Sequence, residues 1–193
     1  MSAPSANPTL AARLWPATSG QAILRTVLRA LFGSLLLWAS AKVQIPFYPV
    51  PMTFQTAVVL LIGLAYGPRL AAATLLLYLA EGAVGLPVFA GTPERGIGLA
   101  YMVGPTGGYL VGFLTAAVIA GWTAERSRHW LTTVLGLLTG VAAIHLLGAA
   151  WLATLIGPAK AVSLGVLPFL LGDAVKIALV ATAAEAGLVR RQG

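Results

Sequence analysis

The residues with the clearest potential for chemistry are Asp173 and Lys176, which lie three positions apart inside an apolar stretch from Leu164 to Val189. On a helix, this spacing places both side chains on one face. Charged side chains deep in a membrane usually face a bundle interior or a cavity, where they mark a functional site. As neighbours the two can both stay ionised and offer a ligand acceptors and donors together. The alternative is an ion pair that only ties two helices together.

The composition identifies the chain as an integral membrane protein. Of its 193 residues, 59% are hydrophobic and 9% are charged, whereas soluble domains contain about 25% charged residues. The apolar runs are long and unbroken, which favours helices over the short alternating strands of a membrane barrel. We expect an all-α integral membrane protein with one domain over residues 21–189. Residues 1–20 and 190–193 are then polar cytoplasmic tails.

The sequence also excludes several kinds of site. There is no cysteine, so disulfides, iron–sulfur clusters and a cysteine nucleophile are impossible. The net charge is +7, but the basic residues are scattered singly, so we do not expect nucleic-acid binding. No hydrolase elbow, metal-ligand cluster or phosphate loop is present, and we expect neither catalytic residues, a metal nor a cofactor. Any ATP-driven energy source must therefore come from another subunit.

Six apolar stretches predict six transmembrane helices. Two of them, 53–66 and 70–83, are separated only by a hinge at Gly67-Pro68-Arg69. At ~1.5 Å per residue each covers about 21 Å, less than a ~30 Å hydrocarbon core, so a re-entrant pair is the alternative to two spans. The other four stretches are 21–42, 101–122, 130–156 and 162–189.

The distribution of Lys and Arg predicts the orientation. With the N-terminus inside, the cytoplasmic side holds eight basic residues and the outer side three, Lys42, Arg95 and Lys160. Both termini then face the cytoplasm, and the two elaborate loops, 43–52 and 84–100, face outward. Asp173 and Lys176 fall in the outer half of the last helix. These features together predict a pocket that opens to the outside.

Other polar and aromatic side chains are positioned to line this pocket. Thr53 and Gln55 begin the second helix, and Glu81 is a further acid at membrane depth, although an interfacial helix end explains it equally well. Arg95, in the glycine-rich loop, suits a carboxylate, or is a solvated loop charge. Four aromatic residues are candidates for the wall or for an interfacial belt: Tyr78, Phe89, Tyr101 and Tyr109.

Two further features concern contacts between helices. His145 is isolated in mid-helix, with no acid or second histidine nearby in the sequence, which favours a helix–helix hydrogen bond over a metal site. Ala30, Gly33 and Ser34 form a small-residue surface on the first helix that permits close helix approach. We expect this surface to contact a partner subunit. Packing within the bundle is the alternative, and a homo-oligomer remains possible.

Four motifs, in order along the chain, resemble the BioY family, the biotin-specific S components of energy-coupling-factor (ECF) transporters. The resemblance covers about residues 25–188. The motifs are Pro49-Val50-Pro51-Met52-Thr53-Phe54-Gln55-Thr56, Gly85-Leu86-Pro87-Val88-Phe89-Ala90-Gly91, Gly104-Pro105-Thr106-Gly107-Gly108-Tyr109, and Pro168-Phe169 with Gly172-Asp173 and Lys176.

The resemblance implies a six-helix bundle in the plasma membrane of a prokaryote, with an outward-facing biotin pocket closed by the loop after the third helix. It also implies docking to a transmembrane T subunit with two ABC-type ATPases. Ala30 and Ser34 stand where the family has a small-x-x-x-small contact, although Ser34 replaces the usual alanine. The alternatives are an S component for another small vitamin, an intramembrane enzyme using Asp173 and Glu81, and a scaffold subunit without a ligand.

Biotin fits the chemistry of these residues. Its ureido ring has two N–H groups and one oxygen, matching Asp173 as acceptor and Lys176 as donor. Its thioether ring and alkyl chain suit an apolar wall. We therefore expect a biotin site formed by Asp173, Lys176, Gln55, Thr53, Tyr78, Glu81, Phe89, Arg95, Tyr101 and Tyr109.

Overall fold

The computed structural model describes residues 21–91, 97–127 and 129–187. Five helical stretches in this part are long and apolar enough to cross a membrane. They are α2 (Ala22–Lys42), α3 (Gln55–Ala83), α5 (Gly107–Arg126), α6 (Trp130–Ile156) and the run Pro158–Glu185, which contains α7 (Pro158–Gly165), the 3-10 turn η2 (Leu167–Phe169) and α8 (Leu170–Glu185). The shorter elements are β1 (Gln44–Ile45), β2 (Met52–Thr53) and α4 (Leu99–Met102).

The element α3 is two helices that fold back on each other at Gly67. This residue has φ 76° and ψ 169°, a conformation that favours glycine, and Pro68 follows it without a backbone N–H to donate. Gln55 Nε2 donates a hydrogen bond to Tyr78 Oη at 2.8 Å. In a straight helix these two residues would be separated by about 35 Å. The predicted hinge at Gly67-Pro68-Arg69 is therefore confirmed. With the two halves of α3 counted separately, the five long stretches of the described residues correspond to the six predicted helices.

The predicted last helix, 162–189, is wrong in its extent. The structure ends α7 at Gly165, turns at Val166 and starts α8 only at Leu170. Pro168 explains the break, because its ring excludes a helical hydrogen bond to the residue four positions earlier. As a result Asp173 lies in the first turn of α8, near the positive end of the helix dipole.

The predicted helix at 101–122 is also displaced. A short helix, α4, ends at Met102, and α5 begins after a turn through Gly104 and Pro105. The proline accounts for this, since the residue before a proline avoids helical geometry. Tyr101 therefore lies on α4 and not on the same helix as Tyr109.

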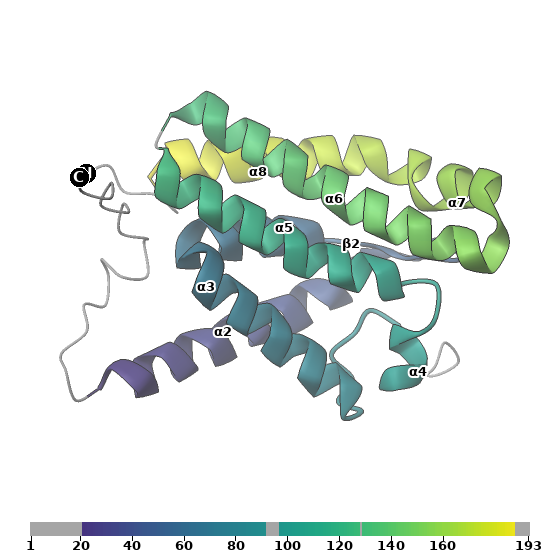
Figure 1. The fold of residues 1–193 in the computed structure, drawn as a ribbon, viewed down its shortest axis with the longest axis horizontal. Helices are drawn as coiled ribbons and strands as arrows, with labels where there is room; N and C mark the ends of the chain where they lie inside the picture. Colours follow the sequence, from purple (N-terminus) through teal and green to yellow (C-terminus); the bar gives the residue numbers. More distant parts are fainter. Residues whose placement is uncertain (1–20, 92–96, 128, 188–193) are drawn as a thin grey trace, which may run out of the picture.

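The core is built around α5. It packs against both α3 and α6, and α6 also contacts α8, as the order of the helices in Figure 1 shows. Small residues allow this close packing: a Cβ atom on Gly63 would lie 2.6 Å from the carbonyl oxygen of Ala117, and one on Gly112 would lie 2.7 Å from the Cα of Ile144. These contacts fix the positions of α3, α5 and α6 relative to one another.

One end of the bundle carries the two structured loops. The segment 43–52, predicted to be an extended loop, contains β1 and the first residue of β2, and these two short strands pair antiparallel. The loop after α3 is anchored through its carbonyl oxygens: Lys42 Nζ donates to Pro87 O and Phe89 O, both at 2.9 Å, and Tyr78 Oη donates to Val88 O at 2.9 Å. The loop is thereby tied to α2 and α3.

Candidate functional site

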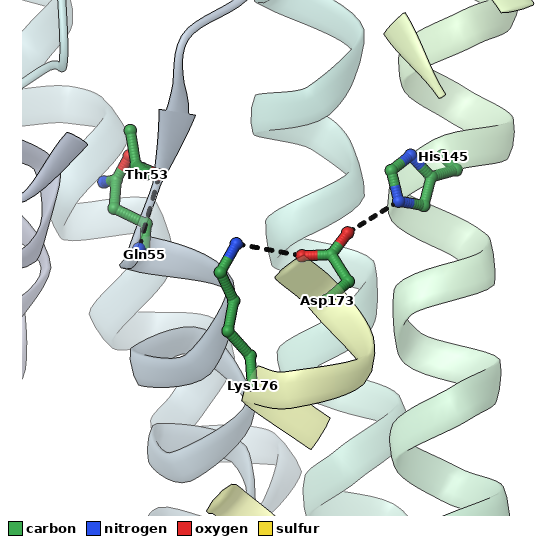
Figure 2. Close-up of polar contacts among 5 residues, drawn as sticks. All are labelled: Thr53, Gln55, His145, Asp173 and Lys176. Carbon is green, nitrogen blue, oxygen red and sulfur yellow. Dashed lines mark hydrogen bonds and ion pairs between the residues drawn. The ribbon is translucent and has the colours of Figure 1, made fainter. Parts of the chain in front are cut away.

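Asp173 is held by two donors from two helices (Figure 2). Lys176 Nζ, one turn along α8, donates to Asp173 Oδ1 at 2.9 Å, and His145 Nε2, on α6, lies 2.8 Å from Asp173 Oδ2. All three residues are buried: Asp173 is 4% exposed, Lys176 7% and His145 9%. The predicted helix–helix hydrogen bond of His145 is confirmed, and its partner is the acid that the sequence singled out.

This polar cluster lies on the wall of a cavity. The space between the lining atoms is about 490 Å³, counting the part open to solvent. Polar wall residues include Thr53, Gln55, Thr56 and Thr106, and apolar or aromatic ones include Val50, Tyr101, Tyr109, Leu110, Phe113, Ile144 and Phe169. A mostly apolar wall with a few convergent polar groups is typical of small-molecule sites.

The sequence predicted ten ligand-binding residues, and six of them line this cavity. They are Asp173, Lys176, Gln55, Thr53, Tyr101 and Tyr109. The six come from four different parts of the chain: the end of the hairpin with the start of α3, and then α4, α5 and α8. Their assembly therefore depends on the fold-back of α3 and the break before α8.

Tyr78 and Phe89 lie behind the cavity wall. The Phe89 ring stacks on Tyr101 with centroids 5.0 Å apart, and its edge meets Tyr78 at 5.5 Å. Tyr78 Oη also accepts the hydrogen bond from Gln55. Both residues thus support side chains that line the cavity, and neither is itself among the lining residues of the described part.

Glu81 lies apart from this cluster. Its carboxylate accepts a hydrogen bond from Ser34 Oγ, and both residues line a separate groove between α2 and the end of α3. Asp173 instead pairs with Lys176 and His145. The geometry gives no support to an enzyme that uses Asp173 and Glu81 as a pair. Arg95 lies outside the described residues.

The small residues of α2 face the interior of the bundle. Ala30 is 8% exposed and Ser34 is 2% exposed. A Cβ atom on Gly33 would lie 2.6 Å from Thr74 Cγ2 and 3.1 Å from the Tyr66 ring. These contacts match the alternative of packing within the bundle. A contact of this surface with a partner subunit stays a prediction.

Several lining residues escaped the sequence analysis. His145 was interpreted only as a helix–helix contact, since Asp173 is 28 positions away from it. Thr106 and Phe169 lie within the quoted motifs but carry no charge that marks them as ligand contacts, and Phe113 is identified only by the packing of the helices. In the described part of the chain, no group of three or more His, Asp or Glu side chains is placed to hold a metal ion.

The chain is similar to known proteins along nearly its whole length. Residues 10–192 match the model of the BioY family. A probable biotin transporter BioY from Pyrococcus horikoshii is 43% identical, with 81% of this chain and 91% of that protein covered. The biotin transporter BioY from Thermotoga maritima is 33% identical, with 82% and 92% covered.

The fold has a solved counterpart. The crystal structure of the S-component for biotin from an ECF-type ABC transporter superposes with a TM-score of 0.77 at 25% identity, covering 92% of this chain and 96% of that chain. Sequence and fold therefore agree: the family match spans all four motifs, and the fold brings Gln55, Tyr109, Asp173 and Lys176 to one cavity. This chain belongs to the BioY family.

Proposed function

We propose that this protein is the biotin-binding S component of an ECF-type uptake transporter. It captures biotin from outside the cell, and partner subunits import the vitamin at the expense of ATP. The relatives from Pyrococcus horikoshii and Thermotoga maritima are named as a probable biotin transporter and a biotin transporter, and the solved counterpart is an S-component for biotin. The observation that carries the proposal is the Asp173–Lys176 pair on the wall of the buried cavity.

The chemistry of the pair matches the ureido ring of biotin. The Asp173 carboxylate has about four acceptor positions, and His145 and Lys176 use two of them. The ammonium group of Lys176 has three donors, one of which bonds Asp173. Asp173 thus accepts a ureido N–H, and Lys176 donates to the ureido oxygen. The thioether ring and alkyl chain pack on Tyr101, Tyr109 and Phe113.

The carboxylate end of biotin points toward the two structured loops. Ala90, next to the anchored segment at 87–89, lines the cavity. Loop backbone N–H groups or Arg95 are the candidate donors for the carboxylate. Glu81, by its position, is the weakest member of the predicted biotin site.

The partners and the orientation follow from the same proposal. A T subunit and two ABC-type ATPases supply the energy, so ATP hydrolysis belongs to the partners. The protein sits in the plasma membrane of a prokaryote with both termini in the cytoplasm, as the eight basic residues of that side favour. Biotin then enters from the side of the hairpin and of the loop after α3.

The biotin content of the purified protein tests this proposal. We expect the chain, purified in detergent from cells grown with biotin, to carry close to one biotin per polypeptide, identified by mass spectrometry of the extracted ligand. A different vitamin in that amount would assign the cavity another substrate. A protein that retains no ligand and binds no added biotin would favour a scaffold subunit.

A further inference from the structure

His145 has a second ring nitrogen whose hydrogen bonding the fold leaves unsatisfied. Nδ1 is buried, and no hydrogen-bond partner lies near it among the residues that the structure describes. The residue is 9% exposed, and its side chain lines the cavity. Figure 2 shows Nδ1 turned away from Asp173, while Nε2 faces that carboxylate. A buried polar atom without a partner is destabilising, so such an atom on a cavity wall points to a ligand.

Asp173 determines which nitrogen of the ring carries the proton. Its Oδ1 accepts from Lys176, which favours the ionised carboxylate, and an ionised carboxylate only accepts hydrogen bonds. Nε2 must therefore be the N–H donor to Oδ2. In the neutral ring, Nδ1 then has a free lone pair and is an acceptor. The ion pair on α8 thus creates an acceptor on α6.

The shape of a cyclic urea calls for such an acceptor. The two N–H groups of the ring lie on opposite sides of the carbonyl group and diverge, so one carboxylate cannot accept both. If Asp173 accepts one and Lys176 donates to the oxygen, the second N–H needs another acceptor. Among the buried side-chain nitrogen and oxygen atoms of the described residues, His145 Nδ1 is the one without a hydrogen-bond partner.

We propose that His145 binds the ligand directly, with Nδ1 accepting the second N–H of the cyclic urea while Nε2 positions Asp173. This inference rests on the proposed function, because it takes biotin as the ligand. It makes His145 a determinant of specificity, since a ligand with only one N–H leaves Nδ1 buried without a partner. Sites built around a ligand N–H discriminate strongly against analogues that lack it.

The substitution His145→Gln separates the two roles of the ring. The amide nitrogen of glutamine can take the position of Nε2 and still donate to Asp173, but no atom replaces Nδ1. We expect His145→Gln to bind biotin about tenfold or more weakly than wild type, with an unchanged unfolding temperature. His129→Gln is the matched control, because His129 is exposed at the start of α6. It should bind biotin like wild type.

Two biotin analogues, in which oxygen replaces one or the other ureido N–H, distinguish a contact from a positioning effect. In wild type, both analogues should bind more weakly than biotin. The variant His145→Gln should bind one of the two analogues as well as it binds biotin. That analogue lacks the N–H group whose acceptor, Nδ1, the variant has already lost. Isothermal titration in detergent measures all of these affinities.

The outcomes separate this inference from the proposed function. If wild type binds biotin and His145→Gln binds it equally well, Nδ1 is not a ligand contact. If His145→Gln binds weakly but both analogue losses persist in full, His145 only positions Asp173, and the proposal is overturned. If wild type does not bind biotin at all, the proposed function itself fails.

Discussion

Asp173 makes more contacts than a simple ion pair requires. Both of its oxygens are bonded, one within α8 and one across to α6, and it lies in the first turn of its helix. Each of these features stabilises a buried carboxylate. Replacing one member of such a cluster is expected to lower the stability of the protein more than replacing two members, because a single replacement leaves a buried charge poorly paired.

Stability measurements on Lys176→Met test this coupling. We expect the single variant to lose up to about 3–5 kcal/mol of unfolding free energy, because Asp173 keeps its charge without its cation. The double variant Asp173→Asn with Lys176→Met should regain part of that loss. Unfolding in detergent, followed by circular dichroism, gives both values. Equal or larger damage in the double variant would contradict the coupling.

The residues of the site were predictable to different degrees. Asp173 and Lys176 stand out because charges are rare in an apolar stretch, and their spacing of three already places them on one helix face. His145 and Asp173 are 28 positions apart, so nothing local links them. For Glu81 the sequence left a pocket position and an interfacial helix end equally open, and only the structure shows that its carboxylate accepts a hydrogen bond from Ser34.

At the scale of the elements, the hinge in α3 brings Gln55 close to Tyr78 and to the cavity. Gly67 has a positive φ with extended ψ, which a residue with a Cβ adopts only under strain. The hinge also packs on α5, since a Cβ atom on Gly121 would lie 2.6 Å from the carbonyl carbon of Gly67. The hinge has little room to move.

We expect Gly67→Ala to lower the unfolding free energy by about 1–3 kcal/mol, the usual range for a residue held in a disfavoured conformation. Gly172→Ala is the matched control, because its new methyl group would meet only the flexible end of Met52. Thermal unfolding of both variants in the same detergent tests this. Equal unfolding temperatures for the two would argue against a strained hinge.

The anchoring of the loop after α3 predicts a kinetic effect. Lys42 bonds the carbonyl oxygens of Pro87 and Phe89, and Phe89 stacks on Tyr101 of the cavity wall. Lys42→Met removes both hydrogen bonds, so we expect biotin to dissociate several-fold faster, given about 1.5–3 kcal/mol for bonds to a charged group. Lys160→Met, at an exposed position of α7, should leave the rate unchanged. The release of labelled biotin in the presence of excess unlabelled biotin measures the dissociation rate. Equal dissociation rates in both variants would contradict an anchoring role for Lys42.

The sequence predicted those structural features that are determined by adjacent residues. Gly67-Pro68 gave the hinge, because each residue alone disfavours a continued helix. The break between α7 and α8 was missed although Pro168 lies in it, because the apolar composition continues across the break. The starting point of α8 matters for function, since it puts Asp173 in the first turn.

At the scale of the whole molecule, the proposed orientation places the cavity entrance and α7 on the outer side of the membrane. The chain contains no cysteine, so a single introduced cysteine reports its own position. We expect Lys160→Cys, in α7, to react with a membrane-impermeant maleimide added to intact cells. His129→Cys, at the start of α6, should react only after the cells are opened. The reverse pattern would place the cavity entrance on the cytoplasmic side.

The central claim is that biotin binds against Asp173, and a titration of three proteins tests it most directly. Asp173→Asn keeps the size of the side chain but presents a misplaced donor and no charge, which costs about 1–3 kcal/mol for an unmatched buried polar group. Glu185→Gln makes the same chemical change at the exposed end of α8. The account predicts that biotin binds tightly to wild type and Glu185→Gln and about 5- to 150-fold more weakly to Asp173→Asn. Equal affinity for all three proteins would contradict it.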